Sequence, residues 1–485
     1  MIKKIRMGNA NVSVATFIVT MLSIISTVVT FLLKNDAPIG YSYIWLLPLS
    51  YGLFYNITSI RHGYFKYLGI TILNTILIIR YLVLPLFSSI SGLYFHSYNA
   101  RIEGSIYTIL IMIYEMVSIL VVLHFLIKKL DKQQLKFQTE IKLSYEKKNG
   151  FYLFSILIGI ISIIIFPAIR ERMNFVIVNS FEYYNLNAIS SICFLFSINV
   201  LRLLFLVYAN NILIRLDAGK HVNKIAIMIL GFFNISVFWG TNRLTVLAQG
   251  IATIALLKAL KIISKKSSYI LIITTCITII SLSSYRLFGY GQLKTFYNES
   301  GTYFSLITIS NYFQSYLGGP DLISIAMNLK YDLSLLHKLD AFTNEILSSI
   351  TFVRQIFPLK SISTTVFFNQ QFGFTEGTSM ILPTLGQSYF YFGTIGAPIL
   401  SLIFCYFLYK AEKMLILCQS IGEKYACYIL VTWLAFFPMQ NLNIVTASFF
   451  NIFLPLYLIV MINKKLNKIK QKHNNIHYNV QYSNK

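Results

Sequence analysis

The sequence predicts an all-α polytopic membrane protein, with about twelve transmembrane helices and one long extracytoplasmic loop. Hydrophobic residues make up 56% of the 485 residues and charged residues only 12%, whereas roughly a quarter of a soluble domain is charged. Apolar runs of about 20 residues, the length that a helix needs to cross a bilayer, recur from one end to the other. The alternating pattern of a membrane β-barrel is absent.

The predicted spans are separated by short polar or charged segments. The first follows the basic stretch MIKKIRMGN and lacks a small-residue cleavage site, so we expect a retained anchor. Pro48 and Pro438 interrupt two of the shorter segments. The twelve segments are 13–33, 41–59, 67–90, 105–127, 151–169, 187–208, 224–240, 244–260, 269–287, 383–409, 425–440 and 443–462.

The formal net charge of +24 lies mostly in short loops between the spans. If the amino terminus is cytoplasmic, every strongly basic loop falls on that side, as the positive-inside rule requires. This favours membrane lipids over nucleic acid as the partner of the positive charge. It divides the chain into an N-terminal transmembrane bundle (1–287), an extracytoplasmic loop with amphipathic helices (288–382), C-terminal transmembrane helices (383–463) and a basic cytoplasmic tail (464–485).

The long outer loop contains two stretches with apolar residues at helical spacing, Tyr303–Leu317 and Leu322–Leu339. Gly318, Gly319 and Pro320 separate them. We expect amphipathic helices that lie at the outer interface or cap the bundle. Recognition or chemistry is expected here, since a long loop on a rigid scaffold often carries function.

Three charged residues lie well inside predicted spans, away from the span ends. Counted at about 1.5 Å per residue, Arg80 and Glu115 lie at matching depths, roughly 21 and 18 Å from the inner ends of consecutive helices. We expect an ion pair between them, the alternative being that Arg80 lines a polar cavity that opens outward. Arg202 is placed one or two turns from the inner surface, where its side chain would extend to water.

Several arginines are predicted at the outer surface, where the positive-inside rule disfavours cations. They include Arg243, Arg286 and Arg354. Arginine binds diphosphate through paired, charge-assisted hydrogen bonds, so a lipid diphosphate at headgroup level is one interpretation and interface anchoring is the other. The five cysteines lack metal-ligand spacing, and we expect neither a metal site nor a disulfide.

Three local motifs resemble one known family. They are GTNR at 240–243, YLGGP at 316–320 and LPTLGQSYFYFGTIG at 382–396. With the overall architecture, they are similar to the Wzy-type O-antigen and capsular oligosaccharide repeat-unit polymerases of bacteria. The family frequently has Glu where this chain has Gln387, and often Asn where Phe390 and Tyr391 precede Phe392. The resemblance therefore does not imply an acid catalyst at position 387.

The resemblance implies a metal-independent membrane glycosyltransferase of the bacterial plasma membrane, similar to other multi-span, lipid-dependent glycosyltransferases. Such enzymes join oligosaccharide repeat units carried on undecaprenyl diphosphate, without a cofactor, at the outer face of the membrane. A flippase and a chain-length regulator would be partners. The leaving diphosphate would be held by Arg243, Arg286, Arg354 and Arg80. Candidates for the general base that accepts the acceptor's proton are Glu376, Asp321 and His337.

Two other classes of protein remain open at this point. A lipid-linked oligosaccharide flippase, or another polytopic transporter, would show short loops on both sides and related halves; neither feature is visible. A ligase or another membrane glycosyltransferase using the same donor would share most of the features described above.

Overall fold

The structure is a computed structural model of the chain. It describes residues 2–35, 37, 40–63, 66–91, 106–136, 146, 148–172, 186–220, 224–236, 243–289, 310, 314, 316–329, 335–356, 363–371 and 380–483. These residues form helices and short connections, and no β-strand occurs among them. The predicted all-α class is therefore confirmed for the described part of the chain.

The first half of the chain supplies most of the bundle. Its elements are α1 (Ile2–Leu32), α2 (Leu46–Ile57), α3 (Ile60–Gly63), α4 (Leu68–Ile78), the π-helical turn η1 (Ile79–Val83), α5 (Leu84–Ser91), α6 (Ile106–Lys136), α7 (Gly150–Ile165), α8 (Pro167–Arg172), α9 (Ala188–Ser197), α10 (Val200–Asp217), α11 (Lys224–Ser236), α12 (Arg243–Ala259) and α13 (Lys265–Gly289).

The second half begins with short helices in the predicted outer loop and returns to the bundle. Its elements are α16 (Pro320–Met327), α17 (Leu335–Ser349), α18 (Thr351–Ile356), α19 (Thr364–Gln371), α20 (Thr384–Gly396), α21 (Ile399–Leu417), α22 (Ile421–Ala435), the 3-10 turn η2 (Phe437–Met439), α23 (Leu442–Ser448), the π-helical turn η3 (Phe449–Phe453) and α24 (Leu454–Ser483).

Several of these helices are long and apolar enough to cross a membrane. Five stretches qualify among the described residues: Val12–Leu32, Leu68–Ser91, Ile106–Gln134, Ala188–Asp217 and Leu442–Ile469. Other apolar helices are shorter, namely Gly150–Ile165, Ile225–Ile235, Leu244–Ala259 and Lys266–Ile279. The structure thus supports a membrane protein, and the total of twelve spans stays a prediction.

The predicted span 383–409 is not one straight helix. Gly393 has φ 68° and ψ −166°, a conformation that glycine adopts readily because it lacks a Cβ. The axes of α20 and α21 differ by 109°. With 19 residues, α21 is about 28 Å long and nearly matches the apolar thickness of a bilayer by itself. We therefore interpret α20 as an arm packed across the end of α21.

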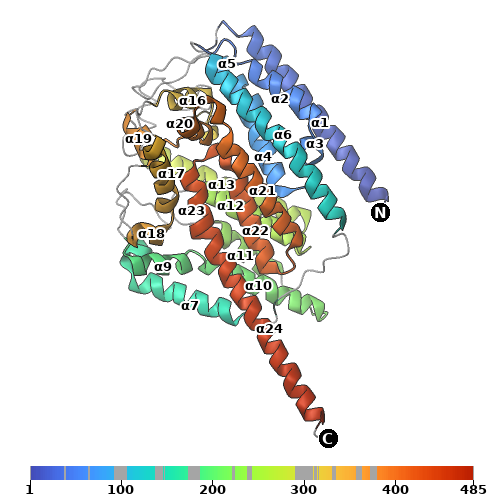
Figure 1. Ribbon diagram of the computed structural model, residues 1–485. Coiled ribbons are helices and arrows are strands. Elements are labelled where there is room, and N and C mark those ends of the chain that lie inside the picture. Colours follow the sequence, from blue (N-terminus) through green and yellow to red (C-terminus); the bar gives the residue numbers. More distant parts are fainter. Residues whose placement is uncertain are drawn as a thin grey trace.

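Helix α22 forms the centre of the bundle. A capping box begins it, in which Ser420 and Glu423 bond each other's backbone N–H groups. Every residue of α22 except Lys424 is buried, because α4, α12, α21 and α24 all pack against it. Figure 1 shows α1, α2 and α6 on one side of this centre and α7 and α9 on the other.

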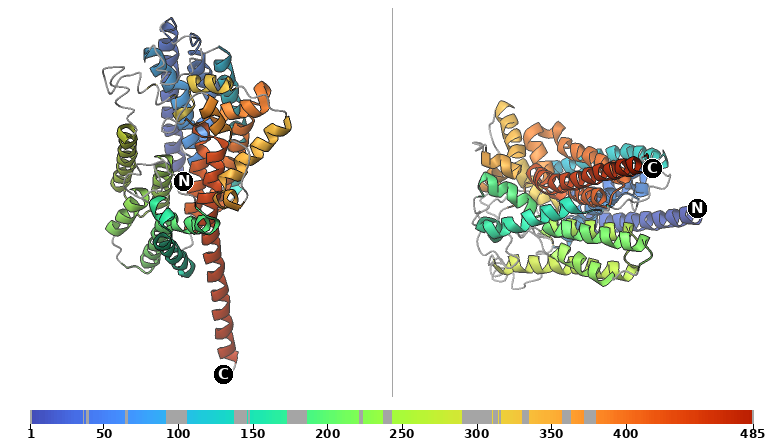
Figure 2. Two further views of the ribbon diagram at one scale, coloured as in Figure 1. Left: turned by 90° about the vertical axis from the view of Figure 1, so that its left-hand side faces the viewer. Right: turned by 90° about the horizontal axis from the view of Figure 1, so that it is seen from below.

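The chain termini and the outer-loop helices lie at opposite ends of the bundle. In Figure 1 the N terminus lies at the right and the C terminus at the bottom, while α16, α19 and α20 lie toward the upper left. The last turns of α24 extend beyond the other helices, as the left view of Figure 2 shows. This arrangement agrees with termini on one side of a membrane and the outer-loop helices on the other.

The predicted amphipathic helix Leu322–Leu339 is wrong in its extent. Helix α16 ends at Met327, and α17 begins at Leu335. Seven of the eight residues of α16 are buried, including Leu322 and Ile325, which pack against Phe368 of α19. Hence α16 lies inside the protein instead of at a lipid interface. Most of the other predicted helix, Tyr303–Leu317, lies outside the described residues.

Candidate functional site

The candidate site is formed where the YLGGP segment of the outer loop meets Arg80. Arg80 belongs to η1, a π-helical turn within the long helix that runs through α4 and α5. Few helices contain a π-helical turn, and those turns that do occur are often found at functional sites. The Nε of Arg80 donates to the carbonyl oxygen of Gly318 over 3.1 Å. We call the group of Arg80, Glu115 and Gly318 the arginine junction.

The predicted ion pair between Arg80 and Glu115 is confirmed. Arg80 Nη1 lies 3.2 Å from Glu115 Oε2, with the two side chains 1% and 0% exposed. The carboxylate also accepts hydrogen bonds from the hydroxyls of Ser401, over 2.5 Å, and Tyr81, over 3.4 Å. A buried charge pair is tolerated when its remaining polar atoms have partners, and on Glu115 they do.

The guanidinium of Arg80 retains unused donor capacity. Its Nη2 is buried and has no hydrogen-bond acceptor among the described residues. Buried donors are nearly always paired, so an unpaired one calls for an explanation. Because Arg80 already contacts the outer segment through Gly318, the spare donors lie next to the part of the loop that carries the YLGGP motif.

The segment from Gln314 to Asp321 is fixed from several sides. The side chain of Gln314 accepts from the backbone N–H of Asp321 over 3.3 Å and donates to Ser88 of α5 over 2.9 Å. Tyr41 donates to the carbonyl oxygen of Pro320. These contacts join the loop to α5 and to the residues that precede α2.

Two glycines allow the motifs at 316–320 and 382–396 to touch. Gly318 has φ +59°, and a Cβ there would lie 3.0 Å from Pro383 Cβ. A Cβ on Gly386 would lie 2.4 Å from the Cβ of Ala326 in α16. The close approach of α16 to α20 thus depends on glycine, which explains these residue types at both positions.

Asp321 is a buried carboxyl group at the beginning of α16. Its side chain is 8% exposed, and Oδ1 has no hydrogen-bond partner among the described residues. Burial penalises the charged form and raises the pKa of Asp321 to about 7. A carboxyl group with a pKa near neutrality can both accept and release a proton at physiological pH.

Helix α20 presents one polar face to its surroundings. Thr384, Gln387, Ser388 and Tyr391 follow the spacing i, i+3, i+4, i+7 and are all buried. The hydroxyl of Thr384 lies 2.7 and 2.6 Å from the carbonyl oxygens of Phe437 and Gln440. Ser388 donates to the carbonyl oxygen of Gly396 over 3.0 Å. These contacts hold α20 against η2 and against the bend that leads to α21.

A second buried carboxylate, Glu345 of α17, is bound to this face. Its Oε2 accepts from the hydroxyls of Thr364, over 2.5 Å, and Tyr391, over 2.8 Å. Gln387 donates to Thr364 over 3.0 Å and accepts from the backbone N–H of Leu442 over 2.8 Å. We call Glu345, Thr364, Gln387 and Tyr391 the glutamate cluster. It ties α17, α19, α20 and α23 together.

Sequence reasoning missed Glu345, although a signal for it exists. The chain has only 17 acidic residues, and Glu345 lies four residues after Ala341 on the buried side of α17. A carboxylate on the buried face of an amphipathic helix needs hydrogen-bond donors from elsewhere. Its Oε1 has none among the described residues.

Two of the other predicted site residues lie at the surface. His337 of α17 and Arg354 of α18 are exposed. Figure 1 shows α18 well apart from α16 and α20. Arg243 begins α12 and Arg286 belongs to α13, but their side chains, and Glu376 altogether, lie outside the described residues.

The expectation that Arg202 extends to the inner surface is wrong. The helix that carries it continues to Asp217, 15 residues or about 22 Å further on. The side chain is 3% exposed and donates to Gln249, Asn199 and the carbonyl oxygen of Ile198. Arg202 therefore belongs to a buried polar network and does not reach water.

Comparison of the chain with known protein families, with curated proteins and with solved structures finds no match. Within the described part of the chain, no three His, Cys, Asp or Glu side chains are close enough to hold a metal ion together. The functional assignment therefore depends on the arginine junction, the glutamate cluster and the resemblance of the motifs.

Proposed function

We propose that this protein is a membrane glycosyltransferase that polymerises lipid-linked oligosaccharide repeat units at the outer face of the bacterial plasma membrane. The donor would be a chain on undecaprenyl diphosphate and the acceptor the sugar of an incoming unit. The product would be a surface polysaccharide, such as capsule, O-antigen or exopolysaccharide.

One observation carries the proposal. The motifs YLGGP and LPTLGQSYFYFGTIG lie more than 60 residues apart in the sequence, and they approach each other closely at Gly318 and Pro383. Gly386 of the second motif also approaches Ala326 of α16, the helix that begins at the end of the first motif. Arg80 contacts the first motif directly. Two of the three motifs of the resemblance thus lie at one place, beside a buried arginine with spare donors.

The chemistry requires a cation and a base. The acceptor hydroxyl oxygen attacks the anomeric carbon of the donor, the bond from that carbon to the diphosphate oxygen breaks, and the diphosphate leaves with the electron pair. Fixed arginines stabilise the developing negative charge. The hydroxyl proton passes to a base, and Asp321, with its pKa raised to about 7 by burial, suits that role better than the exposed His337.

A transporter is the second candidate, and the break between α20 and α21 favours it. Transporters often bind substrates at discontinuous helices. A flippase would move the lipid-linked unit across the membrane without lengthening it. The two functions are distinguished by the product, since only a polymerase forms new glycosidic bonds.

The proposal is tested with chromosomal variants of Arg243 and Arg286, the two arginines predicted at the outer ends of spans. If they hold the diphosphate, Arg243→Ala and Arg286→Ala should each reduce the rate on the order of 10²–10³, by analogy with the loss of one oxyanion-hole donor. Surface glycan resolved by length on a gel should shift to single units or very short chains, with protein amounts matched by immunoblot.

The matched control is Arg170→Ala, because Arg170 is an exposed arginine of α8 with no proposed role in binding. It should leave chain length unchanged. Lysine at 243 or 286 should restore part of the activity, since it keeps the charge without the forked geometry. Long chains from both alanine variants would contradict the proposal.

A further inference from the structure

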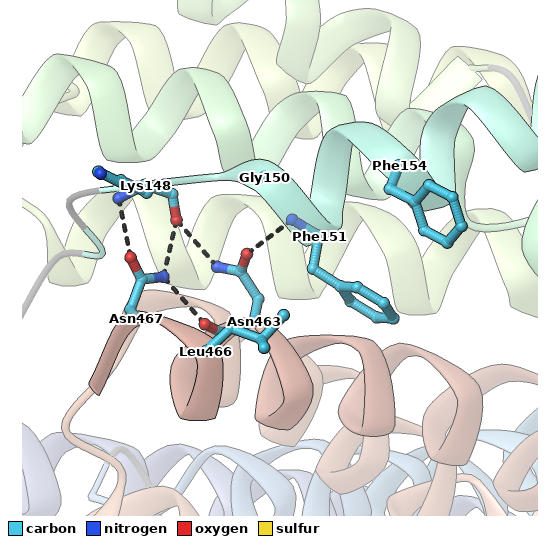
Figure 3. Close-up of a pocket in the computed structure, with 7 residues that line it drawn as sticks. All are labelled: Lys148, Gly150, Phe151, Phe154, Asn463, Leu466 and Asn467. Carbon is cyan, nitrogen blue, oxygen red and sulfur yellow. Dashed lines mark hydrogen bonds between the residues drawn. The ribbon is translucent and has the colours of Figure 1, made fainter. Parts of the chain in front are cut away.

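A shallow groove of about 280 Å³ lies between the beginning of α7 and the middle of α24, at the end of the bundle where both chain termini lie. Figure 3 shows its lining: Lys148, Gly150, Phe151 and Phe154 on one side, and Asn463, Leu466 and Asn467 of α24 on the other. We call it the α7–α24 groove. It is separate from the arginine junction and the glutamate cluster.

Two asparagines on one face of α24 hold the groove in shape. Asn463 and Asn467, spaced i and i+4, both donate to the carbonyl oxygen of Lys148, over 3.2 and 2.7 Å. Asn467 also accepts from the N–H of Lys148, and Asn463 from the N–H of Phe151. The chain entering α7 is therefore fixed to α24, so the groove is built into the fold.

Both sides of the groove carry an exposed apolar side chain. Phe154 is 54% exposed and Leu466 is 43% exposed. The rings of Phe151 and Phe154 lie 5.9 Å apart and continue this surface along α7. Exposed apolar groups at the rim of a membrane bundle are suited to contact with an acyl chain.

The opposite end of the groove is positively charged. Lys148 is exposed and supplies the cation of the groove lining. Lys465 and Lys468 of α24 are also exposed, but they do not belong to that lining. The ammonium of Lys464 pairs with Glu423 and is occupied, whereas Lys148 forms no ion pair with a described residue. The beginning of α7 adds the partial positive charge of a helix N-terminus.

The groove lies where both helices change from apolar to basic. On α24 the sequence LYLIVMIN gives way to KKLNKIK, and α7 follows directly after KKNG. Such a change marks the boundary between acyl chains and headgroups. The groove therefore presents apolar side chains on the membrane side and Lys148 on the water side.

We propose that the α7–α24 groove binds one anionic phospholipid of the cytoplasmic leaflet. Its phosphate would lie at Lys148 and the beginning of α7, and one acyl chain would lie along Phe154 and Leu466. A zwitterionic lipid would leave Lys148 without a net counter-charge. An acidic protein segment would match the charge of Lys148 but would leave the apolar side chains uncovered.

The test uses the purified full-length protein in nanodiscs that contain either phosphatidylglycerol or phosphatidylcholine. Lipid retained after transfer to detergent is counted by native mass spectrometry, and its affinity is obtained by titration. Lys148→Gln should weaken phosphatidylglycerol binding about fivefold, the usual contribution of one lysine near an anionic surface. Lys220→Gln is the matched control, because Lys220 is an exposed lysine after α10 that lies outside the groove lining.

Gly150→Leu tests the apolar part of the groove without threatening the fold. A Cβ at Gly150 meets no atom within 4 Å, so the larger side chain should occupy the groove and not disturb the helix. Retention of one phosphatidylglycerol by the wild type and by Lys220→Gln, with loss in Gly150→Leu, would support the site. Equal retention of the two lipids, or equal phosphatidylglycerol binding by all variants, would overturn it.

Discussion

Breaking the Arg80–Glu115 pair should destabilise the protein more than any exposed charge substitution. We consider Arg80→Gln, Glu115→Gln and the double variant. Each single change leaves one buried charge without its partner, while the double change removes both charges. Arg354→Gln serves as the control, because Arg354 is exposed on α18.

The magnitude follows from the observed geometry. At the Nη1–Oε2 distance of 3.2 Å, two unit charges attract each other by about 5 kcal/mol for an effective dielectric constant of ~20. The partner that remains keeps some hydrogen bonds: Glu115 keeps Ser401 and Tyr81, and Arg80 keeps the carbonyl oxygen of Gly318. Each single variant should therefore lose about 3–5 kcal/mol of unfolding free energy.

The assay is equilibrium unfolding by SDS in mixed detergent micelles, followed by tryptophan fluorescence. In the double variant the loss should be smaller than the sum of the two single losses by about 3 kcal/mol, because neither charge is left unpaired. Additive losses, or single variants as stable as Arg354→Gln, would refute the proposed energetic role of the pair.

Three further outcomes are expected. Burial raises the pKa of Asp321 from 3.8 to about 7, so the folded state binds the extra proton between these values. Stability should thus fall by up to about 4 kcal/mol as pH rises from about 4 to 7, and pH titration of unfolding should show a smaller fall in Asp321→Asn. Gly386→Ala should lower the free energy of unfolding by about 1–3 kcal/mol, because the new Cβ would lie 2.4 Å from the Cβ of Ala326. Adding Ala326→Gly should restore part of this loss. An unchanged melting temperature in Gly386→Ala would contradict this packing. Finally, single cysteines are introduced at Ser300 or Ser483 in a cysteine-free background, and intact cells are treated with an impermeant thiol reagent. The cysteine at 300 should react, and the cysteine at 483 should not. The reverse pattern would contradict the predicted topology.

The sequence was informative where one physical rule dominates. Apolar length and charge bias predicted the helical membrane class, and depth counting paired Arg80 with Glu115. Both inferences use a helix rise that scarcely varies. The same counting placed Arg202 too close to the inner surface, because its helix continues to Asp217. The sequence has no strong helix stop signal before Gly219, so the end of this helix could not be predicted from it.

The rest depended on tertiary contacts that local patterns do not encode. The apolar stripe of Leu322–Leu339 predicted an amphipathic helix at the outer interface or capping the bundle, whereas α16 ends at Met327 and is buried against α19 and α20. Nothing in the local sequence pairs Glu345 with Thr364 and Tyr391, because these residues come from three separate helices. The bend at Gly393 was hidden within an apolar run of ordinary composition.

The most direct test of the account is a reaction with purified components. The full-length protein in liposomes would receive an undecaprenyl-diphosphate-linked repeat unit of the source organism, and the products would be resolved by mass spectrometry. Polymerisation requires products that are integral multiples of the unit, with release of undecaprenyl diphosphate, and a slower rate for Asp321→Asn. Transfer of unchanged single units across the membrane, with no multimers formed, would contradict the account and identify a transporter.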